Sequence, residues 1–467
     1  MSNVIVIGGG LAGLAASVAL AQAGVNVALL ESRPRLGGRA SSFEDGATGE
    51  LIDNCQHVAM GCCTNFRHFC QVTGLAPFFR DEEQLTFVGP PDPSGRELPK
   101  FCRFAATPWG CAPLHLGQAL WGLSYLSLRD KFAIARGLCS LWMVNPPQKD
   151  RTSFAEWLGR QRQTVSAIDY FWNVVLVSAL SESLDRISLA AGRKVFVDGF
   201  LTHREGWKVS LPTVPLDELY SGKLTQWLAA HDVDVRLKTG VERLCLADGA
   251  ISAVELRNGE RLTARQFVLA VPQQRALSLL PESIRTRPQM VAIEELETAP
   301  IASVHLWFDR PITLLPHAVL VGRLSQWVFN RSQKTKTQQF VERSGSPSFY
   351  YQVVISNARD VAERAAADVV ADVVAELKAI WPWAAAAELR HSRVIIEHQA
   401  VFSPLPGSEA LRPAQQSPIG NLQLAGDWTQ TGWPATMEGA VRSGFLAAEN
   451  VLANIGRPAK WLQPDLR

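Results

Sequence analysis

Hydrophobic positions at the start of the chain predict a strand, a helix and a second strand within about 30 residues, closed by the acidic residue Glu31. The segments are, in order, an apolar strand at residues 4–7, a glycine-rich turn at 8–13, an alanine-rich helix at 14–22 and a strand at 25–30. Gly24 ends the helix. This order is typical of a βαβ unit that binds a dinucleotide.

Apolar runs of strand length return in the middle of the chain and near its end. They predict strands at residues 233–237, 241–245, 251–256, 267–271 and 421–425, with Asn258-Gly259 as a hairpin turn. Gly426-Asp427-Trp428 follows the last strand, and a helix is expected to begin near Met437. The polar run at 333–338 (QKTKTQ) is expected to be an exposed loop.

A long uncharged stretch predicts a surface for lipid. Phe104 to Leu128 contains 25 residues without Asp, Glu, Lys or Arg, but prolines and glycines interrupt it, which argues against one continuous spanning helix. Tryptophans punctuate the wider segment 104–145, and charged residues follow Leu128. We expect this segment to contact a membrane interface, and the alternative is that it forms the apolar core of a substrate domain.

Composition narrows the classes of function. The chain has 467 residues, of which 47% are hydrophobic and 19% charged, and its length allows two or three domains. The formal net charge is only +2 with dispersed cations, so no nucleic-acid partner is predicted. The N-terminus shows neither a signal peptide nor a membrane span, so a cytoplasmic protein is expected.

Four of the eight cysteines lie close together, at Cys55, Cys62, Cys63 and Cys70, with two histidines between them. Adjacent cysteines do not match the usual spacing of zinc ligands, so no metal site is predicted. Reduced, buried cysteines in a cytoplasmic protein are the favoured interpretation.

The glycine turn has the residues that a pyrophosphate site requires. Gly8 permits the tight turn, Gly10 lets backbone N–H groups approach a phosphate, and Gly13 lets the helix pack closely on the strand. The helix N-terminus adds partial positive charge. Glu31 is placed to accept the hydroxyls of an adenosine ribose, and its charge disfavours the 2′-phosphate of NADP.

The following segment, Arg33-Pro34-Arg35-Leu36-Gly37-Gly38-Arg39-Ala40, resembles the flavin amine-oxidase and phytoene-desaturase superfamily. The resemblance implies an α/β fold with a Rossmann-type FAD-binding domain and an α+β substrate domain. It also implies non-covalent FAD, because the C-terminal loop lacks the cysteine of covalent flavin oxidases. The cofactor residues that it implies are Gly8, Gly10, Leu11, Ala12, Gly13, Glu31, Ser32, Arg33, Gly38, Arg39, Ala40, Val241, Gly426, Asp427, Met437, Glu438 and Ala440.

The same resemblance divides the chain between two domains. Residues 1–75, 226–274 and 415–467 are expected to form the FAD-binding domain. Residues 76–225 and 275–414 are expected to form the substrate domain, which contains the apolar segment 104–145.

Two runs, Asp53 to Asn65 and Ala425 to Ala440, resemble the signature of hydroxysqualene dehydroxylases, the squalene-associated flavoproteins of bacterial hopanoid pathways. This resemblance implies reductive dehydroxylation of hydroxysqualene to squalene by hydride from reduced FAD. It places Gln56 and His57 near the isoalloxazine, with His57 as the first candidate for the proton donor and Asp53 as the second. It also implies a C30 isoprenoid lipid substrate, peripheral contact with the inner face of the cytoplasmic membrane and association with squalene-pathway enzymes.

Three alternatives stay open at this point. A phytoene-type polyprenyl desaturase would use the same fold and transfer hydride from the substrate to FAD. A flavin amine oxidase would need an aromatic cage, for which Trp433 offers one wall. A non-catalytic, FAD-stabilised lipid carrier or scaffold would bind flavin without turning it over.

Overall fold

A computed structural model describes residues 3–92, 94, 97–147, 150–332 and 348–466. The polar run predicted as a loop at 333–338 lies outside the described residues. The centre of the cofactor half is a five-stranded parallel sheet of order β10-β2-β1-β14-β20. Its strands are β1 (Val4–Ile7), β2 (Val27–Leu30), β10 (Asp234–Arg236), β14 (Gln266–Leu269) and β20 (Leu422–Leu424).

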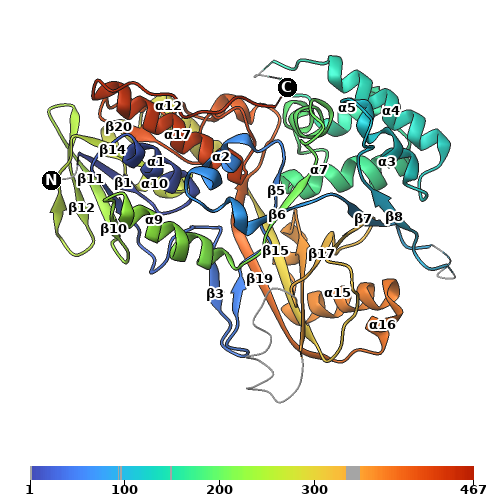
Figure 1. Ribbon diagram of the computed structural model, residues 1–467. Helices are drawn as coiled ribbons and strands as arrows, with labels where there is room; N and C mark the ends of the chain where they lie inside the picture. The colour runs from blue at the N-terminus through green and yellow to red at the C-terminus, as the bar shows by residue number, and fades with distance from the viewer. Residues whose placement is uncertain (1–2, 93, 95–96, 148–149, 333–347, 467) are drawn as a thin grey trace.

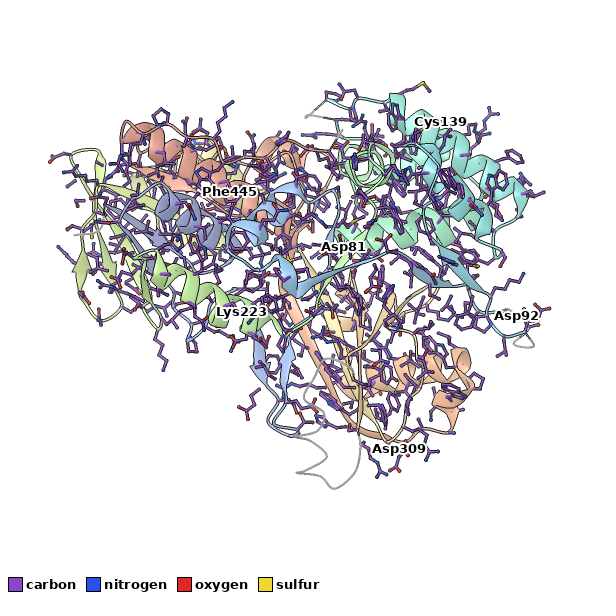
Figure 2. All side chains as sticks on the ribbon, viewed as in Figure 1. Asp81, Asp92, Cys139, Lys223, Asp309 and Phe445 are labelled. Atoms are coloured by element: carbon purple, nitrogen blue, oxygen red, sulfur yellow. The ribbon has the colours of Figure 1, made fainter. Side chains whose placement is uncertain are left out.

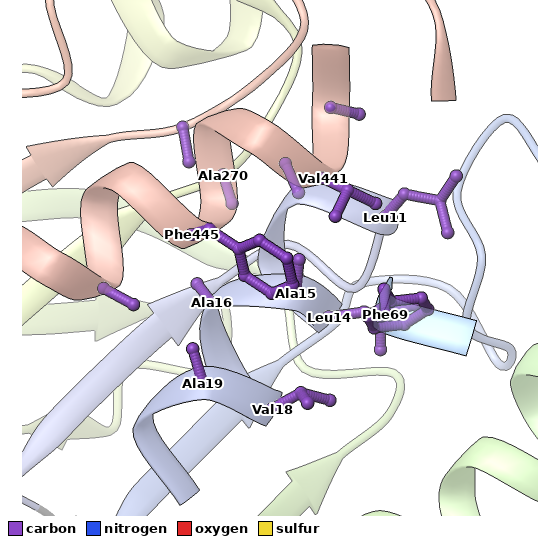
Figure 3. Close-up of a cluster of buried hydrophobic side chains, with 14 of the residues drawn as sticks. Leu11, Leu14, Ala15, Ala16, Val18, Ala19, Phe69, Ala270, Val441 and Phe445 are labelled. Carbon is purple, nitrogen blue, oxygen red and sulfur yellow. The ribbon is translucent and has the colours of Figure 1, made fainter. Parts of the chain in front are cut away.

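Both faces of this sheet are covered, which explains why its strands are apolar throughout. Val4 and Val6 face a core made with helices α1 (Leu11–Gln22) and α17 (Met437–Asn454), while Ile5 and Ile7 face the opposite core. Figure 3 shows small alanines of α1 against Val441 and Phe445 of α17. The two ends of the chain therefore form one helical layer.

The opposite face packs on an antiparallel sheet of β11 (Val241–Ala247), β12 (Ala250–Leu256) and β13 (Arg261–Leu262). The predicted turn Asn258-Gly259 joins the last two strands, and Gly259 has a φ of +86°. Helices α9 (Leu224–Ala230), α10 (Gln273–Leu279), α11 (Glu282–Arg285) and α12 (Pro288–Val291) complete this half. Helix α2 (Thr64–Val72) contacts α17.

A seven-stranded sheet of order β19-β15-β18-β17-β16-β7-β8 forms the frame of the second half. Its strands are β7 (Leu85–Val88), β8 (Phe101–Phe104), β15 (Thr298–Phe308), β16 (His317–Leu320), β17 (Trp327–Asn330), β18 (Phe349–Ile355) and β19 (Leu389–Phe402). Helices α15 (Ala366–Ile380) and α16 (Pro382–Ala385) lie at the lower right of Figure 1, and α14 (Arg359–Ala362) contacts β15. Short sheets join the halves: β3 (Ser42–Glu44) with β4 (Leu51–Asp53), and β5 (Ala59–Met60) with β9 (Val209–Pro212) and β6 (Phe79–Glu82).

A helical layer lies at the other end of the second half, at the upper right of Figure 1. It consists of α3 (Gly117–Gly122), α4 (Leu128–Met143), α5 (Phe154–Arg160), α6 (Val165–Ala167), α7 (Asn173–Leu180), α8 (Leu189–Arg193) and the π-helical segments η3 (Ile168–Trp172) and η4 (Lys194–Leu201). A third π-helical segment, η5 (Glu218–Lys223), continues into α9 and packs in the core of the cofactor half. Within the residues that the structure describes, no helix is long and apolar enough to cross a membrane.

The predicted α/β class with two functional halves is confirmed. The parallel sheet takes its strands from all three segments expected for the FAD-binding domain, and the seven-stranded sheet lies within the segments expected for the substrate domain. The residue boundaries of the two domains stay a prediction. The first helix begins at Leu11, three residues before the predicted start, because Gly10 already serves as its N-cap.

Candidate active site

The N-terminus of α1 faces a cavity and carries no side-chain cap. Gly10, its N-cap, makes no side-chain hydrogen bond, and the first turn contains no acidic residue. A Cβ at Gly10 would meet nothing within 4 Å, so this position opens onto free space. The first amides of a helix have no acceptor within it, so their partial positive charge is available to an anion such as a pyrophosphate.

Gly13 has a structural part in the same turn. A Cβ at Gly13 would lie 1.9 Å from the carbonyl oxygen of Gly8, so only glycine lets α1 lie this close to the end of β1. Gly8 has a φ of +107°, a conformation that other residues rarely adopt. Gly13 is also the one predicted cofactor residue that does not line the cavity.

Glu31, at the end of β2, fixes the turn and the segment that follows it. Its carboxylate accepts hydrogen bonds from the backbone N–H groups of Gly9 and Arg33, each at 2.7 Å. The residue is buried and lines the cavity. A fixed negative charge here suits ribose hydroxyls and opposes a phosphate.

Arg39 joins the two sequence-distant halves of the site. Its guanidinium donates to the Asp427 carboxylate at 2.6 Å and to the carbonyl of Ala400 in β19 at 2.5 Å. Burial opposes the charge, but the Asp427 carboxylate outweighs this effect and raises the pKa of Arg39. Arg39 is therefore a cation at the cavity wall, held in place by groups from the C-terminal third of the chain.

The C-terminal elements close the site from the other side. The Thr436 side chain caps α17 by accepting from the N–H of Gly439 at 3.1 Å. Glu438 is buried and accepts hydrogen bonds from the backbone of Asn65 and Phe66 at the start of α2. Burial raises the pKa of Glu438. Glu438 therefore ties α17 to α2 at the cavity wall.

One continuous cavity of about 1180 Å³ connects these groups with the substrate half. It exceeds the range of about 300–1,000 Å³ usual for a single small-molecule site. Its cofactor end is lined by all the predicted residues other than Gly13, and by Thr239, Gly240, Arg257, Arg275 and Glu397, which the sequence patterns did not identify. Its other end is lined mainly by apolar side chains, among them Phe87, Leu116, Leu120, Leu138, Trp142, Tyr170, Phe171, Val175, Phe200, Trp207, Ile301, Trp327 and Phe329.

The residues present fit FAD. Unpartnered helix amides, a ribose-binding carboxylate and a fixed arginine all converge on one end of the cavity, where Gly10 leaves open space. Met437 and Glu438 place the start of α17 at the same wall. A helix N-terminus there suits a flavin ring that gains negative charge on reduction.

The contacts of Asp53 do not fit the catalytic role predicted for this residue. Its side chain is fully buried, pairs with Arg331 at 2.7 Å, and accepts from the Ser42 hydroxyl and the Leu216 N–H. It does not line the cavity. All these contacts of the carboxylate are structural. We therefore infer that Asp53 stabilises the segment that follows it.

Gln56 and His57 lie where that segment meets the cavity. The amide of Gln56 donates to the carbonyl of His57 and accepts from Arg331. Nδ1 of His57 lies 3.0 Å from the carbonyl oxygen of Cys55, which can only accept, so Nδ1 carries the proton. Burial lowers the pKa of His57, so the ring is neutral near pH 7 and its Nε2 is an acceptor.

Three of the four clustered cysteines lie in the core, and Cys55 lines the cavity. Cys62, Cys63 and Cys70 are buried among apolar side chains of α1, α2 and α17, and burial raises the pKa of the half-buried Cys55 to about 12. Within the described ranges no group of three or more His, Cys, Asp or Glu residues converges as a metal site would require.

Sequence patterns gave no signal for Arg331 or Lys194. Arg331 belongs to no recognisable motif, and only the fold brings it to Asp53 and Gln56. Lys194 lines the cavity, lies 4.6 Å from the ring centroid of Trp433, and pairs with Asp198 and Asp465. The ring of Trp433 therefore faces the Lys194 cation and not a second aromatic ring, which the aromatic cage of an amine oxidase would need.

Known proteins resemble the chain over nearly its whole length. The sequence profile of the flavin containing amine oxidoreductase family matches residues 11–452. The zeta-carotene desaturase of Synechocystis is 29% identical over 97% of this chain and 98% of its own, and a 15-cis-phytoene desaturase of Solanum lycopersicum is 24% identical over 98% and 80%. Among solved structures, an oxidoreductase of Methanosarcina mazei covers 94% of this chain and 98% of its own with a TM-score of 0.71 at 16% identity, and a putrescine oxidase covers 97% and 99% with 0.67 at 17%.

Proposed function

The chain belongs to the flavin-containing amine oxidoreductase family, and from this premise we propose that it transfers hydride between FAD and a long polyprenyl hydrocarbon. Desaturation of the phytoene type is the favoured reaction. The observation that carries the proposal is the single cavity with a nucleotide-binding end and a long apolar end. FAD, when bound, supplies the hydride acceptor or donor.

The apolar end suits a hydrocarbon better than an amine. The carboxylates at the cavity wall are Glu31, Asp427, Glu438 and Glu397. The first three belong to the predicted cofactor set, and Glu397 interacts electrostatically with Arg39. Among the described lining residues, no carboxylate lies with the apolar ones to attract a cationic substrate. A water-poor channel also protects hydride transfer from competing reactions.

His57 offers the second group that desaturation needs. Forming a C=C bond from two adjacent CH groups removes a hydride from one carbon and a proton from the other. The neutral ring of His57 has an unprotonated Nε2, which can accept that proton at the cavity wall. The relatives named as carotenoid desaturases support this direction.

Reductive dehydroxylation of hydroxysqualene is the second candidate, favoured by the resemblance of the run Asp53 to Asn65 to the dehydroxylases. In that reaction the allylic C–O bond breaks as the hydroxyl takes up a proton and leaves as water, and hydride from reduced FAD forms the new C–H bond. It needs a proton donor, and neutral His57 already commits its N–H to Cys55. Among the described lysines, Lys194 is the one that lines the cavity and could donate. Association with squalene-pathway enzymes is proposed for this candidate only.

The two reactions are separated by the direction of electron flow. FAD-loaded protein is mixed anaerobically with phytoene in detergent, and flavin absorbance and lipid products are followed together. Desaturation predicts bleaching of oxidised flavin matched by a product with one more double bond. In the second arm, chemically reduced protein is mixed with hydroxysqualene. Flavin reoxidation matched by squalene there, with no bleaching in the first arm, would replace desaturation by dehydroxylation. No reaction in either arm would refute both.

A further inference from the structure

Helix α4 has one buried apolar face and one apolar face whose side chains are exposed. Its buried face packs in the core of the helical layer and includes Ala133, Ile134, Gly137 and Leu141. Its exposed apolar side chains are Leu128, Phe132, Cys139, Trp142 and Met143, and Phe132, Cys139 and Trp142 or Met143 follow one another at separations of seven and of three or four residues. Such spacing places them on one stripe of the helix. Figure 2 labels Cys139 on this helix, at the end of the molecule away from the N-terminus.

Neighbouring segments extend the stripe. Trp109 is 96% exposed, Leu114 is 72% exposed, and the exposed ring of Trp121 packs edge-on against Phe132. We call this group the apolar rim; it comprises Trp109, Leu114, Trp121, Leu128, Phe132, Trp142 and Met143. Large exposed apolar side chains gathered on adjoining elements mark an interaction surface.

The rim is continuous with the cavity. Leu114, Cys139, Trp142 and Met143 are exposed to solvent and also line the cavity. The apolar end of the cavity therefore reaches the surface between η2 (Leu114–Leu116) and α4. A hydrophobic molecule could pass from the rim to the cavity without crossing a polar surface.

The charge around the rim is positive. Arg129 and Arg136 lie one heptad apart on α4 and are exposed, and Arg204 donates to the carbonyl of Pro108 beside Trp109. Within the described chain, none of these three arginines forms a salt bridge. The one carboxylate in residues 98–147 is Asp130, which is buried and bonded to Ser127 and Thr164, and Glu205, next to Arg204, forms an ion pair with Lys208. The surface is thus complementary to anions.

We propose that the apolar rim docks on an anionic lipid bilayer and that the cavity opens into that bilayer. Tryptophans, aliphatic side chains and flanking arginines are the composition of an interfacial helix that lies in the headgroup region. Docking stands on the rim alone. The passage of substrate from bilayer to cavity rests in addition on the proposed function.

Binding to vesicles tests the docking without any substrate. FAD-loaded full-length protein is sedimented with vesicles of phosphatidylcholine alone or mixed with phosphatidylglycerol. We expect binding that strengthens with phosphatidylglycerol content. Leu128→Ser/Phe132→Ser should weaken it by at least about tenfold, because two apolar side chains leave the interface. Arg129→Gln should weaken binding to anionic vesicles by about fivefold.

Matched controls use exposed residues outside the rim. Leu314→Ser/Trp383→Ser removes two comparably exposed apolar side chains, and Arg285→Gln removes an exposed arginine. Both controls should bind vesicles as the parent protein does, and FAD content reports that every variant is folded. Equal loss in the controls, or no loss in the rim variants, would overturn the proposal.

Two further outcomes are informative. The parent protein could fail to bind vesicles and instead form dimers in sedimentation-velocity runs. If Leu128→Ser/Phe132→Ser abolishes those dimers, the rim is a contact between copies of this chain and the proposal fails. If vesicles bind as expected while neither phytoene nor hydroxysqualene reacts, docking stands and the proposed function fails. The two inferences are therefore separable.

Discussion

His57 is the side chain on which the direction of proton transfer depends. Because its N–H is donated to the backbone and burial lowers its pKa, it can accept a proton over the whole neutral range. His57→Ala should lower kcat for desaturation by about 100-fold or more, the usual contribution of a general base. FAD content and the flavin spectrum should stay close to those of the parent protein.

The dependence of the desaturation rate on pH shows whether His57 accepts or donates the proton. The acceptor form of His57 is complete above its pKa, which lies below the ordinary value of about 6.5. The parent rate should therefore be flat at neutral and higher pH and fall as pH drops through this lowered pKa, below 6.5, and His57→Ala should lack this acidic limb. A rate that instead rises toward low pH would identify His57 as a proton donor and contradict the assignment.

Asp53 is predicted to matter for stability rather than for chemistry. Asp53→Asn removes the carboxylate that pairs with the buried Arg331 guanidinium at 2.7 Å, which should cost about 3–5 kcal/mol of unfolding free energy. Asp372→Asn, which breaks an ion pair whose carboxylate is 56% exposed, should cost less than about 1 kcal/mol. Chemical denaturation of both variants measures the difference. Equal, small effects would show that the buried pair does not hold this segment.

At the scale of elements, the approach of α1 to β1 controls cofactor binding. Gly13→Ala would place a Cβ 1.9 Å from the Gly8 carbonyl oxygen, so the helix must move away. We expect about 1–3 kcal/mol of destabilisation and loss of most bound FAD, measured from the flavin absorbance of purified protein.

Gly159 in α5 provides the control for this substitution. A Cβ there meets nothing within 4 Å, so Gly159→Ala should keep FAD and leave stability unchanged or raised by up to about 1 kcal/mol. Full FAD content in Gly13→Ala would contradict the packing argument.

Sequence patterns predict the helices and strands that are determined by neighbouring residues in the chain. The first βαβ unit and the start of α17 follow from apolar runs and glycine positions, and they occur where the sequence predicts them within a few residues. The predicted apolar segment 104–145 contains α4, but its charges at Arg129, Asp130 and Lys131 predict a polar face on this helix. Asp130 and Lys131 prove to be buried, and only the fold shows it.

At the scale of the molecule, the sequence predicts two halves but not how they meet. Arg331 reaches Asp53, and Ala400 of β19 reaches Arg39, across hundreds of residues. No periodicity or motif encodes such pairings, since each depends on tertiary packing. The same limit explains why the cavity and its opening beside α4 emerge only from the structure.

In the proposed arrangement one cavity holds FAD at one end and a polyprenyl chain at the other, so a substitution that blocks the apolar end is a decisive test. Val175 of α7 lines this part of the cavity, whereas Val165 is 74% exposed and does not. The measurement is the rate at which phytoene bleaches the flavin under anaerobic conditions. We predict that Val175→Trp retains FAD but loses at least about 100-fold in this rate, while Val165→Trp behaves as the parent protein. Undiminished bleaching in FAD-loaded Val175→Trp, or none in the parent protein, would contradict the account.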